Sequence, residues 1–116
     1  MEYIVSLFLL FTMQCVVSKP SLSEMTALQF LYNQTNGNEW YWRPDYVRHG
    51  IPWNFTTISE QNPCNRSLPW QGVTCNKNES SITILNLRYY NLNGKYFHNQ
   101  KILKKLKTVY IYMINY

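Results

Sequence analysis

Residues 82–94, which read ITILNLRYYNLNG, decide the fold. Their apolar side chains follow the spacing L-x-x-L-x-L: Ile82, Leu85 and Leu87. The same spacing returns in residues 106–116, LKTVYIYMINY, so that Leu87 and Ile111 are 24 residues apart. A fixed period of this length indicates a repeat in which each unit contributes one short strand, with its apolar residues pointing inward and the intervening side chains lining a concave sheet.

The outward positions of these two predicted strands form a candidate binding face. They are Ile84, Asn86, Arg88 and Tyr89 in the first unit, and Thr108, Tyr110, Tyr112 and Met113 in the second. Tyrosine supplies a large, rigid contact area with a polar end, which suits recognition. We therefore predict ligand contacts from the polar and aromatic members, namely Asn86, Arg88, Tyr89, Tyr110 and Tyr112. The alternative is that Ile84 and Met113 cover the core and that ten tyrosines make some exposure inevitable.

The N-terminus predicts secretion. Residues 1–20 read MEYIVSLFLLFTMQCVVSKP, an apolar run that is short for a membrane span but suits a signal peptide cleaved before Lys19. A signal anchor is the alternative, because no basic residue precedes the run. No second long apolar stretch follows, so we expect a secreted or cell-surface protein, attached to a membrane only if the signal stays uncleaved or a missing C-terminal part carries an anchor.

Cleavage would remove Cys15 and leave Cys64 and Cys75 in the segment NPCNRSLPWQGVTC. In an oxidising compartment such an even pair predicts a disulfide. Zinc would need more ligands than the two histidines of the chain offer in their unrelated contexts, and the spacing differs from a C-x-x-C redox site. We predict a structural disulfide, no metal site and no cofactor.

Four N-glycosylation signals agree with secretion. Their acceptor residues are Asn33, Asn54, Asn65 and Asn78. The net charge of +5 is concentrated in a lysine-rich stretch between residues 95 and 107. An acidic partner is one interpretation and a solvated face is the other. Secretion argues against nucleic acid as that partner.

Residues 21–34, SLSEMTALQFLYNQ, predict an amphipathic helix. Ser21 and Glu24 form a capping-box signature, and Asn36-Gly37 would end the helix. Its apolar stripe recurs every three residues: Leu22, Met25, Leu28 and Leu31. Residues 36–80 hold all four tryptophans and all but one of the prolines without any period, which predicts an aromatic-rich loop region. These tryptophans would either pack against the helix or form a carbohydrate-binding surface.

Together these segments resemble the N-terminal cap of plant-type leucine-rich-repeat proteins. The resemblance is carried by the helix ALQFLYNQTNG, the Trp-rich spacer, the block PCNRSLPWQGVTC and the repeat with N-L-x-G that follows. It implies that Cys64 and Cys75 form the cap disulfide, that Trp70 packs beside it and that Val73 begins a strand. The implied fold class is α+β, with a cap helix and a disulfide-bonded loop at the start of a leucine-rich-repeat solenoid of short parallel strands. Residues 1–18 would be the signal peptide, 19–80 the cap, and 81–116 one complete and one partial repeat.

Two features depart from that family. Its Asn ladder expects asparagine at position 9 of each repeat, but Tyr90 and Ile114 occupy that position and Asn91 and Asn115 come one residue later. Either the ladder is absent or the turn is rearranged. The array also stops inside its second repeat, which suggests a fragment of a longer receptor-like protein. Its exposed repeat edge would favour self-association.

The sequence favours no enzyme class. Apart from Glu2, the acidic residues are scattered: Glu24, Glu39, Asp45, Glu60 and Glu79. No nucleophile or phosphate-loop motif is present. We therefore expect a non-catalytic extracellular recognition and capping module that binds a protein, peptide or glycan. The alternative is a free-standing small secreted disulfide-bonded protein of a lectin-like or toxin-like kind.

Overall fold

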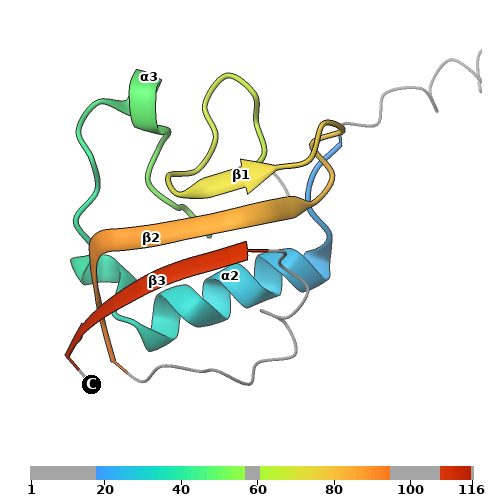
Figure 1. The fold of residues 1–116 in the computed structure, drawn as a ribbon. Coiled ribbons are helices and arrows are strands. Elements are labelled where there is room, and N and C mark those ends of the chain that lie inside the picture. The colour runs from blue at the N-terminus through green and yellow to red at the C-terminus, as the bar shows by residue number, and fades with distance from the viewer. Residues whose placement is uncertain (1–17, 57–60, 95–107, 116) are drawn as a thin grey trace, which may run out of the picture.

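The computed structural model describes residues 18–56, 61–94 and 108–115, and of the last segment beyond Thr108 the backbone alone. Residues 1–17 of the predicted signal peptide and the lysine-rich stretch lie outside these ranges. The elements follow the order α2 (Leu22–Gln34), η1 (Gly37–Glu39), α3 (Tyr46–His49), β1 (Val73–Cys75), β2 (Ile82–Asn93) and β3 (Thr108–Asn115). In Figure 1, β2 lies between β1 and β3, and the long helix α2 runs alongside the sheet. No helix within the described ranges is long and apolar enough to cross a membrane.

The predicted helix and its capping box are confirmed. Ser21 is the N-cap residue of α2, its hydroxyl accepts a hydrogen bond from the Glu24 amide, and the Glu24 side chain reaches back to the cap. After the C-cap, Asn36 adopts a left-handed conformation with φ 54° and leads the chain away from the helix axis. The predicted apolar stripe is confirmed for Met25, Leu28 and Leu31, which are buried. It is wrong for Leu22, which is 73% exposed.

The sheet contradicts the expected solenoid of short parallel strands. β1 pairs with β2 in the antiparallel direction, and only β2 and β3 are parallel. β2 is also long, with 12 residues. The parallel partners Leu85–Val109 and Leu87–Ile111 are offset by the 24 residues seen in the sequence. One parallel pair beside an antiparallel edge strand makes a small mixed sheet, and with α2 the fold is of the α+β class. No stack of parallel strands is present in the described ranges.

An irregularity in β2 explains the displaced asparagine. Leu85 and Leu87 are buried at alternate positions, but Arg88 and Tyr89 are both exposed and burial resumes at Tyr90. Tyr89 has a positive φ of 68°, and the pairing with β3 shifts register between Leu87 and Leu92. An extra residue of this kind inverts the in-and-out alternation of a strand. Just after this irregularity the Asn91 side-chain amide donates to the Glu39 carbonyl at 2.9 Å, which fixes the end of β2 to the segment that follows α2.

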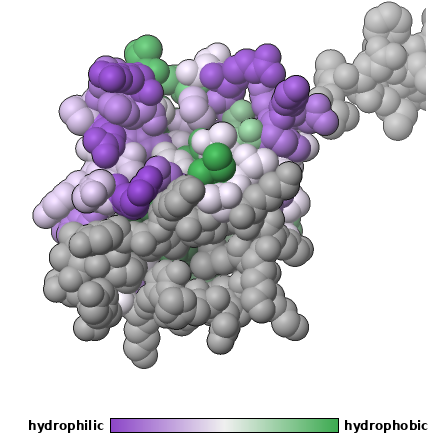
Figure 2. All heavy atoms as spheres, viewed as in Figure 1, coloured by the Kyte–Doolittle hydropathy of each residue, from purple (hydrophilic) through white to green (hydrophobic). Residues whose placement is uncertain are grey.

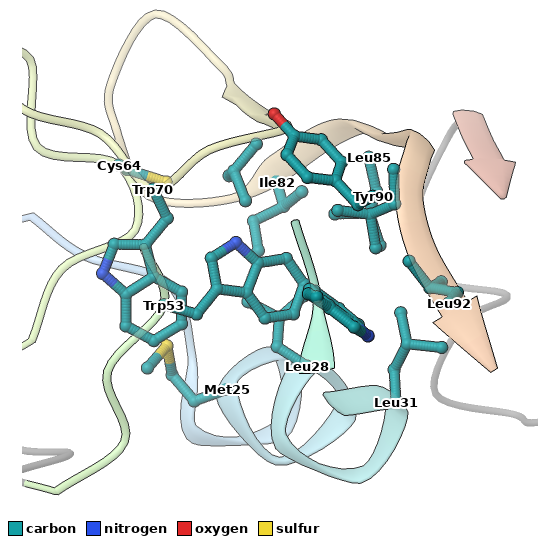
Figure 3. Packing of buried hydrophobic residues seen from close by; sticks show 13 residues of the cluster. Met25, Leu28, Leu31, Trp53, Cys64, Trp70, Ile82, Leu85, Tyr90 and Leu92 are labelled. Atoms are coloured by element: carbon teal, nitrogen blue, oxygen red, sulfur yellow. The ribbon is translucent and has the colours of Figure 1, made fainter. Parts of the chain in front are cut away.

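The core lies between α2, β2 and the loops that connect them (Figure 3). Leu28 and Leu31 of the helix face Leu85 and Leu92 of β2, and indole rings from the loop region fill the remaining space. Three of the four tryptophans are buried: Trp40, Trp53 and Trp70. Their rings pack in tilted, edge-on and stacked pairs, with Trp40 and Trp53 centroids 5.0 Å apart. Of the two predicted roles for the tryptophans, these three rings therefore pack in the core, and none of the three is exposed enough to bind a carbohydrate.

Glu24 also ties the helix to the sheet. The residue is only 9% exposed, and its carboxylate accepts a 2.7 Å hydrogen bond from the Ile82 amide at the start of β2. The Ser81 hydroxyl donates to the same oxygen at 3.2 Å. The capping box therefore fixes where β2 begins as well as where α2 begins.

Candidate binding groove

A groove of about 640 Å³ opens on the side of β1 and β2 away from α2. Its floor comes from the first part of the sheet, including Gly72, Thr74 and Asn86. Its walls come from α3 on one side and from the disulfide loop on the other. In Figure 1 both of these segments stand above β1, and Figure 2 shows hydrophilic residues gathered where α3 lies. We call this feature the basic groove.

The name reflects its lining, which brings together four arginines from separate parts of the chain: Arg43, Arg48, Arg66 and Arg88. His49 lines it as well, and none of its lining residues carries a carboxylate. Two acidic residues lie near its rim. Glu79 forms an ion pair with Arg66 at 2.7 Å, and Asp45 accepts a 3.2 Å hydrogen bond from the Arg48 backbone amide. The groove thus keeps an excess of positive charge.

Gln71 positions the wall that carries α3. This side chain is fully buried and its amide group makes three hydrogen bonds to the backbone of residues 43–50. Its oxygen accepts from the Arg43 amide at 2.9 Å, and its nitrogen donates to the Arg43 and Gly50 carbonyls at 2.8 and 2.9 Å. An isolated loop would leave these backbone groups to water, so Gln71 substitutes for a neighbouring strand.

Gly50 allows the two walls to approach. It adopts a φ of 90°, and a Cβ atom at this position would collide with the Pro69 carbonyl. Beside it, the Ile51 amide donates to the Pro69 carbonyl at 2.8 Å, and the Gln71 amide donates to the Ile51 carbonyl at 2.9 Å. This two-residue parallel bridge needs a residue without a side chain next to it.

The opposite wall is held by covalent and local bonds. Cys64 and Cys75 are joined in a disulfide, with Cα atoms 5.7 Å apart. Between them, the Asn65 side chain accepts from the amides of Ser67 and Leu68 at 2.9 and 3.1 Å. These turns place Arg66, whose side chain is 81% exposed, at the edge of the groove.

Tyr89 supplies the exposed aromatic ring of the groove. It is 73% exposed and lies at the bulge of β2, while its neighbour Tyr90 turns inward and is 5% exposed. A bulky side chain rarely adopts a positive φ, and here that conformation directs Tyr89 outward. The Arg43 guanidinium lies 5.6 Å from the centre of the Tyr90 ring, which draws this arginine towards β2.

The predicted binding residues divide into two groups. Asn86, Arg88 and Tyr89 all line the basic groove. The side chains of Tyr110 and Tyr112 lie outside the described part, and their backbone belongs to β3. The sequence pattern missed Arg43, Arg48 and Arg66, because they lie in aperiodic loops whose partners are distant along the chain. A cluster of arginines around the cysteine and tryptophan block is the signal that could have suggested them.

The four predicted glycosylation acceptors are all exposed: Asn33, Asn54, Asn65 and Asn78. None of them lines the basic groove. At Asn54 the side-chain oxygen accepts from both the amide and the hydroxyl of Thr56, at 3.0 and 2.6 Å. Glycans at these four asparagines would therefore be attached outside the groove lining.

Within the ranges that the structure describes, no three His, Cys, Asp or Glu side chains gather into a group that could hold a metal ion. The groove offers guanidinium donors, the side-chain amide of Asn86, hydroxyl groups, an imidazole and one exposed aromatic ring. Comparison of the chain with protein-family models, with curated proteins and with solved structures found no match. The function therefore has to be argued from the groove itself.

Proposed function

We propose that this chain is a non-catalytic extracellular recognition module that binds a protein, peptide or glycan ligand in the basic groove. The observation that carries the proposal is the convergence of Asn86, Arg88 and Tyr89 with arginines from two other segments around one cavity. A volume of about 640 Å³ falls within the range of roughly 300–1,000 Å³ that is usual for ligand sites.

Secretion is part of the proposal. It is supported by the disulfide between Cys64 and Cys75, by the apolar N-terminal run and by the exposure of four N-glycosylation acceptors. We further propose that residues 19–80 are a cap-type module from a longer receptor-like protein. The capped helix, the disulfide loop and β1 starting at Val73 support this relation.

The outer edge of β3 suggests a second kind of contact. Among the described residues β3 pairs only with β2, so its other edge offers backbone donors and acceptors to a second chain. We propose self-association through this edge as an accompaniment to ligand binding. Sedimentation equilibrium over a range of concentrations measures it, and a monomer at every concentration would contradict it.

Binding to intact cell surfaces tests the recognition function. The full-length chain, expressed in a secretory host and fluorescently labelled, should bind saturably. Tyr89→Ala should lower the binding because it removes the exposed ring of the groove. Tyr41→Ala is the matched control, since Tyr41 is 66% exposed but does not line the groove. Absence of saturable binding, or equal losses in both variants, would refute the proposal.

A further inference from the structure

We propose that the ligand of the basic groove is a polyanionic glycan, a chain of sugars that carries sulfate or carboxylate groups. This inference rests on the proposed recognition function and narrows its ligand class. It is drawn from the charge of the groove, from the burial of the apolar residues at its floor and from the way the backbone that carries its arginines is held.

The charge of the groove calls for anionic ligand groups. Four arginines line one cavity without a carboxylate in the lining, and all four are exposed: Arg43, Arg48, Arg66 and Arg88. Guanidinium groups bind sulfate and carboxylate through paired hydrogen bonds, which makes them selective for planar or multidentate anions. Glu79 forms an ion pair with Arg66 and Asp45 lies beside Arg48, so four guanidinium groups of the lining are set against two carboxylates near the rim.

The remaining lining favours sugar over peptide. Uncharged peptides are recognised through apolar side-chain pockets or through addition to a strand edge, whereas acidic peptides are recognised by arginine clusters and are tested below with hexaglutamate. The apolar residues at the floor are buried, with Trp70 1% and Val73 8% exposed, and β1 is only three residues long. Val47 of α3 is the exposed aliphatic side chain of the lining, and it forms no pocket with the two buried ones. Tyr89 is 73% exposed and supplies an aromatic ring for contact with a sugar. In the same lining the Asn86 side-chain oxygen accepts from the Arg88 amide and Nε, both at 3.3 Å, and the Asn86 side-chain nitrogen can donate to sugar hydroxyl groups.

The groove is also held in place before any ligand binds. Gln71 fixes the backbone on both sides of Arg43, and the disulfide closes the loop that carries Arg66. Between them the Ile51–Trp70 bridge joins the two walls. A loop whose backbone is already held loses less conformational entropy on binding than a free loop. A repeating anionic ligand can then meet several guanidinium groups at once.

Calorimetry on the secreted full-length chain tests the ligand class. The probes are a heparin-type sulfated hexasaccharide, the same hexasaccharide without sulfate, and a hexaglutamate peptide. The sulfated probe should bind at least about tenfold more tightly than the other two, and its affinity should fall as salt is raised. Arg48→Gln and Arg88→Gln should each weaken it about fivefold, and the two losses should combine in the double variant. Lys77→Gln removes an exposed cation outside the groove lining and should change the affinity less than about twofold.

Each other result overturns the inference in an identifiable way. If the unsulfated hexasaccharide bound as tightly as the sulfated one, and Tyr89→Ala abolished that binding, the ligand would not need negative charge. That result would refute the anionic ligand and leave the recognition function intact. If hexaglutamate bound more tightly than the sulfated hexasaccharide, the ligand would be an acidic peptide and not a glycan. Sulfate-dependent binding that ignores Arg48→Gln and Arg88→Gln would place the anion outside the groove. Absence of binding by all three probes would refute the ligand class, and the cell-surface assay would then decide the recognition function separately.

Discussion

Replacing Gln71 should destabilise the fold more than any other substitution of an uncharged polar side chain in the described ranges. Gln71→Met keeps the length of the side chain and its burial but removes both its donor and its acceptor. Three backbone groups would lose their partners, namely the Arg43 amide, the Arg43 carbonyl and the Gly50 carbonyl. Each of them would then have to reach water by a shift of the loop or stay unpaired.

The magnitude follows from those three groups. A buried group left unpaired costs about 1–3 kcal/mol, and a loop at the surface recovers part of this cost by moving towards water. We expect a loss of about 3 kcal/mol in the free energy of unfolding. A domain of this size has about 5–15 kcal/mol in total, so the change should be large. Gln71→Glu should cost at least as much, because it aims a carboxylate oxygen at the Arg43 and Gly50 carbonyls.

Urea unfolding followed by tryptophan fluorescence measures the effect. Gln34→Met is the matched control, since Gln34 is exposed at the end of α2 and the same change there should cost less than about 0.5 kcal/mol. If the basic groove binds a ligand, Gln71→Met should also weaken that binding, because Arg43 and α3 would no longer be held. A Gln71→Met variant as stable as the Gln34→Met control would refute the reasoning.

Three further predictions concern other parts of the chain. Trp53→Phe should lower the unfolding free energy by about 1–2 kcal/mol more than Trp70→Phe does. The reason is that the Trp53 indole donates to the buried Gln71 carbonyl at 2.8 Å, whereas the Trp70 indole nitrogen has no hydrogen-bond partner in the described ranges. Equal urea midpoints of the two variants would contradict this. Glu24→Ala should cost about 2–3 kcal/mol at neutral pH, because it leaves the buried Ile82 amide unpaired and removes the capping box, and calorimetric melting that stays unchanged would contradict it. Tyr89→Gly should raise the unfolding free energy by about 1 kcal/mol by relieving the positive φ while it weakens groove binding, and a parallel loss of stability and binding would refute this separation.

Local signals predicted the helix well and its exposed face less well. Ser21 and Glu24 act within one helical turn, so the start of α2 could be derived from the sequence. The stripe at every third residue misled at Leu22. At about 100° per residue, nine positions turn a helix by two and a half turns, so Leu22 and Leu31 point in opposite directions. Leu31 faces the core at 4% exposure and Leu22 faces solvent.

The sheet was harder to predict because its geometry depends on two events outside the repeat pattern. The spacing around Leu85 and Leu87 placed a strand correctly, and the bulge at Tyr89 was visible only as an asparagine displaced by one position. The solenoid was wrong because β1 adds to β2 in the antiparallel direction, which a count of leucines cannot reveal. The pairing direction follows from the connection between the two strands: only residues 76–81 join β1 to β2, and a connection this short can link antiparallel neighbours but not parallel ones.

The groove shows why aperiodic segments resist such reasoning. Asn86 and Arg88 could be named because alternation along a strand fixes which side chains share a face. Arg43 joins them because Gln71, 28 residues later, holds its backbone and because its guanidinium lies over the Tyr90 ring. No sequence pattern marks Gln71 as buried, yet its hydrogen bonds hold the wall with Arg43 and α3 next to the disulfide loop. The specificity of the groove therefore resides as much in an uncharged, inaccessible amide as in the arginines that would touch the ligand.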